Sequence, residues 1–171
     1  MDYAWIFIRL AVLIWTLTLC AEAQMDKECL SCICQVDSGC QNIKCQKDKK
    51  RFDGRRVCGY YKLSQKYFDE CGNPGKRFKE NKRLAWERCA QDMVCAGQCV
   101  LAFASKHDDD KCIRSRKDYT ACEMVARNHF GGPRGCRKGN TNRYWRQVKQ
   151  CLDSKNATLK VKGKGKRARG H

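Results

Sequence analysis

Two acidic side chains stand out in the segment CLSCICQVDSGCQNIKCQKD, which covers residues 29–48. Asp37 and Asp48 are its only acids, among five cysteines. Two carboxyl groups on opposite sides of a glycosidic bond can cleave it, because one donates a proton to the leaving oxygen while the other, ionised, stabilises or traps the positive sugar. Taken alone, two acids at this spacing are also compatible with a solvated surface. The residues therefore allow a glycosidase pair without deciding for it.

The cysteines indicate how such a pair would be held in place. The chain has 15 cysteines, and removal of an N-terminal segment that contains Cys20 would leave 14. An even number of cysteines in a short secreted chain predicts a disulfide framework, whose connectivity the sequence does not give. A zinc site is the competing interpretation, but Cys32 and Cys34 are too close together and no paired C-x2-C module follows. We predict disulfides, with no metal and no other cofactor.

Residues 1–23, MDYAWIFIRLAVLIWTLTLCAEA, predict a cleaved secretory signal. The apolar stretch is only about fourteen residues long and is interrupted by Arg9, so it is too short to span a bilayer. It is followed by an A-x-A pattern at residues 21–23. A membrane anchor is the alternative, but no stop-transfer pattern follows. We expect a mature chain that starts near Gln24, secreted to the extracellular space, without a transmembrane anchor.

The formal net charge is +18, from 36 basic and 18 acidic residues. Such a charge predicts anionic partners, and outside the cell these are bacterial envelopes, acidic glycans and phospholipid surfaces rather than a specific nucleic acid. A basic surface that serves only solubility is the other interpretation. Residues 156–171 carry the stretch KGKGKRARG with little to bury, so they predict a disordered basic tail that binds polyanions. Asn156 opens a glycosylation sequon, whose use the sequence does not decide.

Apolar periodicity predicts a single domain of mainly helical α+β class. Residues 81–107 predict one long central helix, and residues 114–129 predict a second helix that stops at Gly131-Gly132-Pro133. Shorter helices are expected at residues 64–71, with Ser64 as N-cap, and at residues 141–152. Residues 29–61 show no sustained helical period, and Asp53-Gly54 predicts a small β-hairpin there.

Four further segments carry a resemblance to a known family. Together with residues 29–48, the stretches CGYYKLSQKYFDECGNPG, RCAQDMVCAGQCV, ARNHFGGPRGC and RKGNTNRYW resemble the invertebrate-type lysozymes, also called the destabilase family. The resemblance runs from about residue 29 to residue 151, with 14 cysteines in the family's order, inside a domain that we place at residues 24–155. It implies a lysozyme-like fold, secretion, and hydrolysis of the β-1,4 bond between N-acetylmuramic acid and N-acetylglucosamine in peptidoglycan.

The resemblance also assigns site residues. The family's catalytic glutamate, in C-x-x-E-S-G-C, falls on Asp37, and its catalytic aspartate, in C-x-x-D, falls on Asp48. Aspartate in place of glutamate withdraws the proton donor by about 1 Å, and a misplacement of that order can cost about a hundredfold in rate, so we expect reduced activity. Tyr60, Tyr61 and His129 are the expected sugar contacts, with core packing as the alternative for the tyrosines. The disulfide cysteines are expected to be Cys29, Cys32, Cys34, Cys40, Cys45, Cys58, Cys71, Cys89, Cys95, Cys99, Cys112, Cys122, Cys136 and Cys151.

The leading hypothesis is therefore a secreted, bacteriolytic glycosidase of the lysozyme type, which acts on peptidoglycan in antibacterial defence or in digestion. The alternative is a catalytically impaired, lysozyme-like cationic protein that binds bacterial envelopes through its basic surface and tail. An isopeptidase activity, credited to some relatives that resemble leech destabilase, is not expected, because no serine precedes Cys58 in the matching segment.

Overall fold

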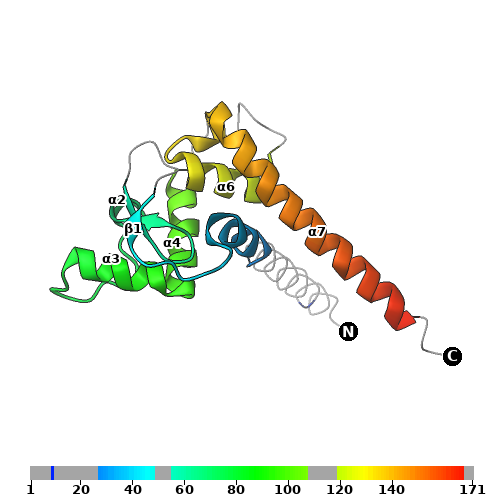
Figure 1. Cartoon of the computed structure of the whole chain (residues 1–171), viewed down its shortest axis with the longest axis horizontal. Helices are drawn as coiled ribbons and strands as arrows, with labels where there is room; N and C mark the ends of the chain where they lie inside the picture. The colour runs from blue at the N-terminus through cyan, green and yellow to red at the C-terminus, as the bar shows by residue number, and fades with distance from the viewer. Residues whose placement is uncertain (1–8, 10–26, 49–54, 108–118, 168–171) are drawn as a thin grey trace, which may run out of the picture.

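Helices from both halves of the chain pack around α4 (Met93–Lys106) in the computed structural model of this protein (Figure 1). The structure describes residue 9 and residues 27–48, 55–107 and 119–167. The other helices are a segment at residues 27–38, α2 (Gln65–Glu70), α3 (Lys82–Gln91), α6 (Ala121–Gly131) and α7 (Asn142–Arg167), with 3-10 turns η1 (Gly135–Arg137) and η2 (Gly139–Thr141) between the last two.

The core joins side chains that are distant in the sequence. One cluster contains five side chains that are each at most 1% exposed: Ile33, Leu63, Phe68, Phe103 and Val148. They come from the helix at 27–38, β3, α2, α4 and α7. This core fixes the ends of the helices on which the predicted site residues lie.

A small antiparallel sheet accompanies the helices, in the order β1 (Gln46–Lys47), β2 (Arg56–Cys58) and β3 (Leu63–Ser64). Gln46 pairs with Val57 and Lys47 with Arg56, so the predicted hairpin is confirmed. Its expected Asp53-Gly54 turn lies outside the described residues. The mainly helical α+β class is confirmed, and β3 is an additional strand that the sequence did not indicate.

The short helix α2 begins as predicted. Ser64 is its N-cap, and the Ser64 hydroxyl accepts a hydrogen bond from the Tyr67 N–H at 3.2 Å. A hydroxyl at this position satisfies one of the free N–H groups of the first turn.

The prediction of one helix over residues 81–107 is wrong, because the chain breaks at Asp92. Asp92 ends α3 with an extended backbone (φ −98°, ψ 119°), and its carboxylate caps α4 by accepting from the Cys95 N–H at 2.8 Å. The Cys89–Cys95 disulfide spans the break. A local side-chain cap thus overrides the helical periodicity of the apolar residues.

The prediction of no helix within residues 29–61 is also wrong, because residues 27–38 form a helix. Cys29, Cys32 and Ile33 form the buried face of this helix, at 2%, 0% and 0% exposure. Their i, i+3, i+4 spacing is a helical signal once half-cystines are counted as apolar residues.

The last two helices differ from the prediction at opposite ends. α6 starts at Ala121, after the N-cap Thr120, and ends at Gly131 with Gly132 at φ +73°, the predicted stop. The earlier part of the predicted helix, residues 114–118, lies outside the described residues. α7 continues to Arg167, which contradicts a disordered tail over residues 156–167. Once a helix is nucleated by packing, each added residue costs little, and this stretch contains no proline.

Six disulfides join described residues: Cys29–Cys122, Cys32–Cys151, Cys34–Cys40, Cys45–Cys58, Cys71–Cys99 and Cys89–Cys95. Cys136 is also disulfide-bonded, and Cys112 lies outside the described residues. The first two bridges attach the helix at 27–38 to α6 and α7. The disulfide-rich character of the fold is confirmed.

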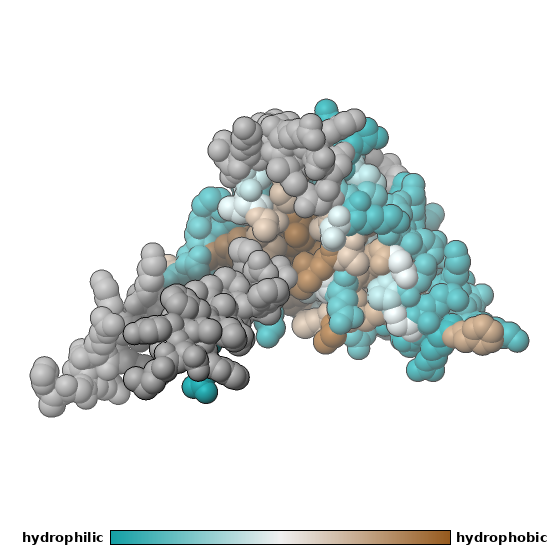
Figure 2. Space-filling model, turned by 180° about the vertical axis from the view of Figure 1, so that it is seen from behind, coloured by the Kyte–Doolittle hydropathy of each residue, from teal (hydrophilic) through white to brown (hydrophobic). Residues whose placement is uncertain are grey.

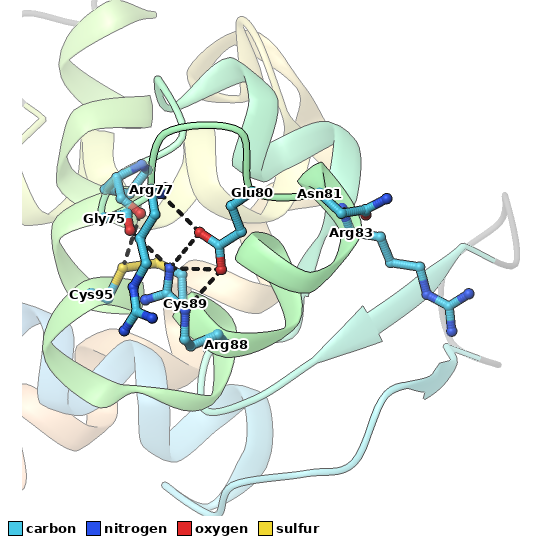
Figure 3. A network of polar contacts seen from close by, with 9 residues as sticks. Gly75, Arg77, Glu80, Asn81, Arg83, Arg88, Cys89 and Cys95 are labelled. Carbon is cyan, nitrogen blue, oxygen red and sulfur yellow. Dashed lines mark hydrogen bonds and ion pairs between the residues drawn. A yellow bond between two sulfur atoms is a disulfide. The ribbon is translucent and has the colours of Figure 1, made fainter.

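The loop between α2 and α3 is fastened by one carboxylate (Figure 3). Glu80 accepts hydrogen bonds from the Arg88 guanidinium and from the Arg77 N–H, both at 2.8 Å, and Arg88 also donates to the Gly75 carbonyl at 2.8 Å. The hydrogen bond from Arg88, followed by that from Arg77, lowers the pKa of Glu80. The loop is therefore anchored to the last turn of α3, where Arg88 lies.

The predicted signal, residues 1–23, lies outside the described residues apart from Arg9. Within the described part of the chain, no helix combines the length and the apolar character needed to cross a membrane.

Candidate active site

Asp37 lies near the end of the helix at 27–38 and is almost enclosed, with 6% of its side chain exposed. One carboxylate oxygen, Oδ2, is 2.7 Å from His129 Nε2. The other, Oδ1, accepts a hydrogen bond from the Tyr144 hydroxyl at 3.0 Å. Three elements, the first helix, α6 and α7, thus meet at the acid that the family resemblance selects.

His129 continues this network into the protein. Its side chain has no exposed surface, and its Nδ1 lies 3.0 Å from the Tyr67 hydroxyl on α2. An imidazole with a hydrogen-bonding group at each nitrogen is fixed in orientation, and it can share one proton with a carboxyl group at 2.7 Å. His129 has no exposed surface in this structure through which to touch a sugar, and its contact is with Asp37 instead.

The two predicted tyrosines are placed differently from each other. Tyr61 is 3% exposed and packs in the core, which is the alternative that the sequence left open. Burial, and then the negative charge of Asp37, raises the pKa of Tyr61, so the two side chains are electrostatic neighbours. Tyr60 is only partly buried. Its carbonyl accepts a hydrogen bond from the Ser38 hydroxyl at 2.6 Å, which ties it to the residue after Asp37.

Asp48 lies at the end of the first strand of the sheet. It follows β1, is partly buried, and its N–H donates to the Arg55 carbonyl at 3.0 Å on the opposing strand. The structure therefore joins Asp37 and His129 in one hydrogen-bond network, places Tyr61 where the charge of Asp37 acts on it, and places Asp48 on a separate element, the hairpin.

The segment that joins the two acids is short and strongly constrained. The Cys34–Cys40 disulfide closes around Asp37, and the Cys45–Cys58 disulfide ties the strand before Asp48 to the end of β2. Between them, Ile43 accepts a backbone hydrogen bond from the Gly59 N–H at 2.9 Å. Gly59 must be glycine, because a Cβ there would lie 1.6 Å from the Ala90 carbonyl oxygen. The backbone segments that carry the two acids are thus held by disulfides and by backbone hydrogen bonds.

A buried ion pair orients the helices that supply His129 and Tyr144. Arg127 is 5% exposed and donates to Glu123 at 2.7 Å, to Thr141 at 2.8 Å and to Asn142 at 2.7 Å. The last two partners stand at the junction of η2 and α7. Arg127 therefore links α6 to the start of the helix that carries Tyr144.

Sequence reasoning missed Tyr67 and Tyr144 as site residues. Both lie on buried faces, where a tyrosine is ordinarily interpreted as a core residue. Tyr144 is also 107 positions from its partner Asp37 in the sequence. The available signal is general: a buried hydroxyl needs a hydrogen-bond partner.

A family model described as Destabilase matches residues 26–151. This chain belongs to the destabilase family. Destabilase-family membership agrees with the resemblance seen in the cysteine-rich segments and makes the protein a lysozyme-type glycosidase.

Individual relatives agree with the family assignment. "Invertebrate-type lysozyme 2" of Caenorhabditis elegans is 41% identical over 131 residues, which cover 77% of this destabilase-family chain and 89% of that protein. "Lysozyme" of Magallana gigas is 39% identical over 141 residues, 82% and 90% of the two chains. The crystal structure of Tapes japonica lysozyme is similar with a TM-score of 0.55 and 33% identity, covering 71% of this chain and 85% of that one. These relatives favour the hydrolase over the impaired binding protein.

Proposed function

We propose that Asp37 and Asp48 are the catalytic carboxylates with which this protein hydrolyses the β-1,4 bond between N-acetylmuramic acid and N-acetylglucosamine in bacterial peptidoglycan. The observation that carries the proposal is the environment of Asp37. A carboxyl group with 6% exposure, held by an imidazole and a phenol, is fixed in one orientation. Solvated surface acids, the alternative interpretation, have no such partners.

In the proposed reaction, Asp37 gives a proton to the glycosidic oxygen while ionised Asp48 stabilises or traps the positive sugar. The contact with His129 fixes one oxygen of the Asp37 carboxyl group, and the hydrogen bond from Tyr144 fixes the other. His129 and Tyr144 are positioning residues. Tyr60, the half-buried member of the predicted set, is the remaining candidate for a sugar contact.

The biological setting is part of the proposal. The predicted signal and the disulfides support a secreted protein, and the net charge of +18 supports attraction to anionic bacterial envelopes. We infer an extracellular role in defence against bacteria or in their digestion.

Product analysis tests the assignment. Purified peptidoglycan is incubated with the oxidatively folded protein, and the new reducing ends are identified by mass spectrometry after borohydride reduction. The proposal expects reduced N-acetylmuramic acid ends from the wild type and none above background from Asp37→Asn. New N-acetylglucosamine ends, or unchanged release by a folded Asp37→Asn variant, would refute it.

A further inference from the structure

A basic pocket lies beside the hairpin that carries Asp48. Its volume is about 350 Å³, and it is formed where β2, α2 and α3 meet. The lining residues are Arg55, Arg56, Ser64, Gln65, Lys66, Arg83 and Trp86. Four of the seven are cationic and none is acidic, so the pocket presents positive charge to whatever enters it.

Two of the cations at the rim, Arg83 and Lys66, pair with acids of the protein in exposed positions. Arg83 pairs with Glu87 at 3.0 Å and Lys66 with Glu70 at 3.8 Å, but the two cationic side chains are 61% and 66% exposed. Exposed pairs of this kind contribute about 0–1 kcal/mol, so an incoming anion can compete for their cations. Figure 3 shows Arg83 pointing away from the Glu80–Arg88 network, on the side of the strands.

The inner wall of the pocket is fixed, in contrast to its rim. Trp86 is 2% exposed, and its indole N–H donates to the Leu63 carbonyl at 3.0 Å. Ser64 is 6% exposed and holds the start of α2 through its hydroxyl. A preformed wall lowers the ordering cost that a ligand must overcome.

The register of the hairpin relates this pocket to the candidate catalytic acid. Lys47 pairs with Arg56, and the Asp48 N–H donates to the Arg55 carbonyl, so Asp48 lies opposite Arg55 across the two strands. Directly opposite residues of an antiparallel pair project from the same face of a sheet. One wall of the pocket therefore begins next to Asp48.

We propose that this pocket is an oxyanion-binding subsite, which holds a carboxylate or phosphate group carried by the cell-wall polymer next to the bond that is cleaved. The inference rests on the proposed function, because it takes Asp48 as part of the reacting centre. Guanidinium groups match the planar, two-pronged geometry of carboxylate and phosphate oxygens. A volume of about 350 Å³ accommodates such a group with the residue that carries it.

Calorimetric titration of soluble fragments tests the subsite and identifies the source of the anion. The probes are a neutral N-acetylglucosamine oligomer, a muramyl peptide with free carboxylates, and a glycerol phosphate oligomer. The proteins are the wild type, the pocket variant Arg56→Gln/Arg83→Gln, and the control Arg143→Gln/Arg146→Gln, which loses the same charge from exposed positions on α7.

The subsite predicts that at least one anionic probe binds the pocket variant about tenfold more weakly than the wild type, while the control variant stays within about twofold of it. The probe that shows the difference names the anion as carboxylate or phosphate. Equal weakening in both variants would mean binding by overall charge and would overturn the proposal, as would the absence of any anionic binding.

Binding and hydrolysis are measured in separate experiments, so the proposed function and the proposed subsite can be refuted independently. Selective binding of an anionic probe without peptidoglycan cleavage would refute the proposed function and leave an anion site. Cleavage by the wild type without selective binding would refute the subsite alone.

Discussion

At Asp37 the protein uses the shorter of the two acidic side chains and surrounds it with fixed partners. His129 and Tyr144 each hold one carboxylate oxygen, at 2.7 and 3.0 Å. Since the side chain is only 6% exposed, the direction in which the acid can deliver a proton depends on these partners. The chemistry of the residue is therefore inseparable from the packing of α6 and α7.

His129 provides the sharpest test of this dependence. Because it is fully buried and touches Asp37 rather than substrate, His129→Gln should lower kcat by about tenfold to a hundredfold and change KM little. Steady-state kinetics on a soluble peptidoglycan fragment measures both constants. His107→Gln, a half-buried histidine outside the network, is the matched control and should behave as wild type. A raised KM at unchanged kcat would instead indicate a substrate contact.

Tyr61 reports on the charge of Asp37. Its folded-state pKa is raised above the ordinary 10.0 by burial and then by Asp37, so the neutral phenol stabilises the folded protein below about pH 10 and this stabilisation is lost as pH rises through the folded pKa. Ultraviolet titration of tyrosinate should show a late-titrating component that is lost in Tyr61→Phe and titrates earlier in Asp37→Asn. An unchanged midpoint in Asp37→Asn would show that the two groups are not neighbours.

At the scale of elements, the contact between α6 and α7 decides whether the site forms. Arg127 and Glu123 are both less than a tenth exposed, and Arg127 also donates hydrogen bonds to Thr141 of η2 and Asn142 of α7. Removal of one partner leaves the other buried and unpaired.

Arg127→Ala should therefore lower the free energy of unfolding by about 3–5 kcal/mol. Denaturant unfolding under oxidising conditions measures this loss. Lys149→Ala, which breaks the exposed Lys149–Asp153 pair on α7, is the control and should cost less than about 0.5 kcal/mol. Similar losses in the two variants would mean that the buried pair does not hold the helices together.

The elements show which parts of the fold the sequence could predict. The cap at Ser64 and the stop at Gly132 depend on local residue types, and both were predicted. The helix at 27–38 was missed because its apolar face consists largely of half-cystines, and the break at Asp92 because a capping carboxylate interrupts a continuous apolar pattern.

The candidate site could be predicted less completely than the helices, because some of its contacts join residues that are distant in the sequence. Asp37, Asp48 and His129 could be selected through the family motifs in which they lie. The contact of Asp37 with Tyr144 joins positions 107 residues apart, and no spacing rule relates them. The same holds for the basic pocket, whose residues come from β2, β3, α2 and α3.

At the scale of the whole molecule, positive charge dominates the surface. Figure 2 shows one face on which hydrophilic residues cover most of the described surface and apolar residues gather toward the middle. With a net charge of +18, approach to an anionic wall is favoured over long distances and is screened by salt within about 8–10 Å at physiological ionic strength.

The C-terminal residues should contribute to this attraction without specificity. Deletion of residues 160–171, which carry six bases, should weaken binding to anionic lipid vesicles and reduce its dependence on salt. Co-sedimentation over a range of salt concentrations measures both effects. A variant of full length with these six bases changed to glutamine should match the deletion. Unchanged binding in both variants would exclude a role for the C-terminal bases.

The central claim, that Asp37 and Asp48 act as a catalytic pair, is tested most directly by the rate at which the folded protein clears a peptidoglycan suspension at low ionic strength. We expect measurable clearance by the wild type and a loss of about a hundredfold or more in Asp48→Asn. Near-ultraviolet circular dichroism confirms that the variant is folded. An Asp48→Asn protein that clears at the wild-type rate would contradict the account, and so would a silent wild type that gains activity through Asp37→Glu.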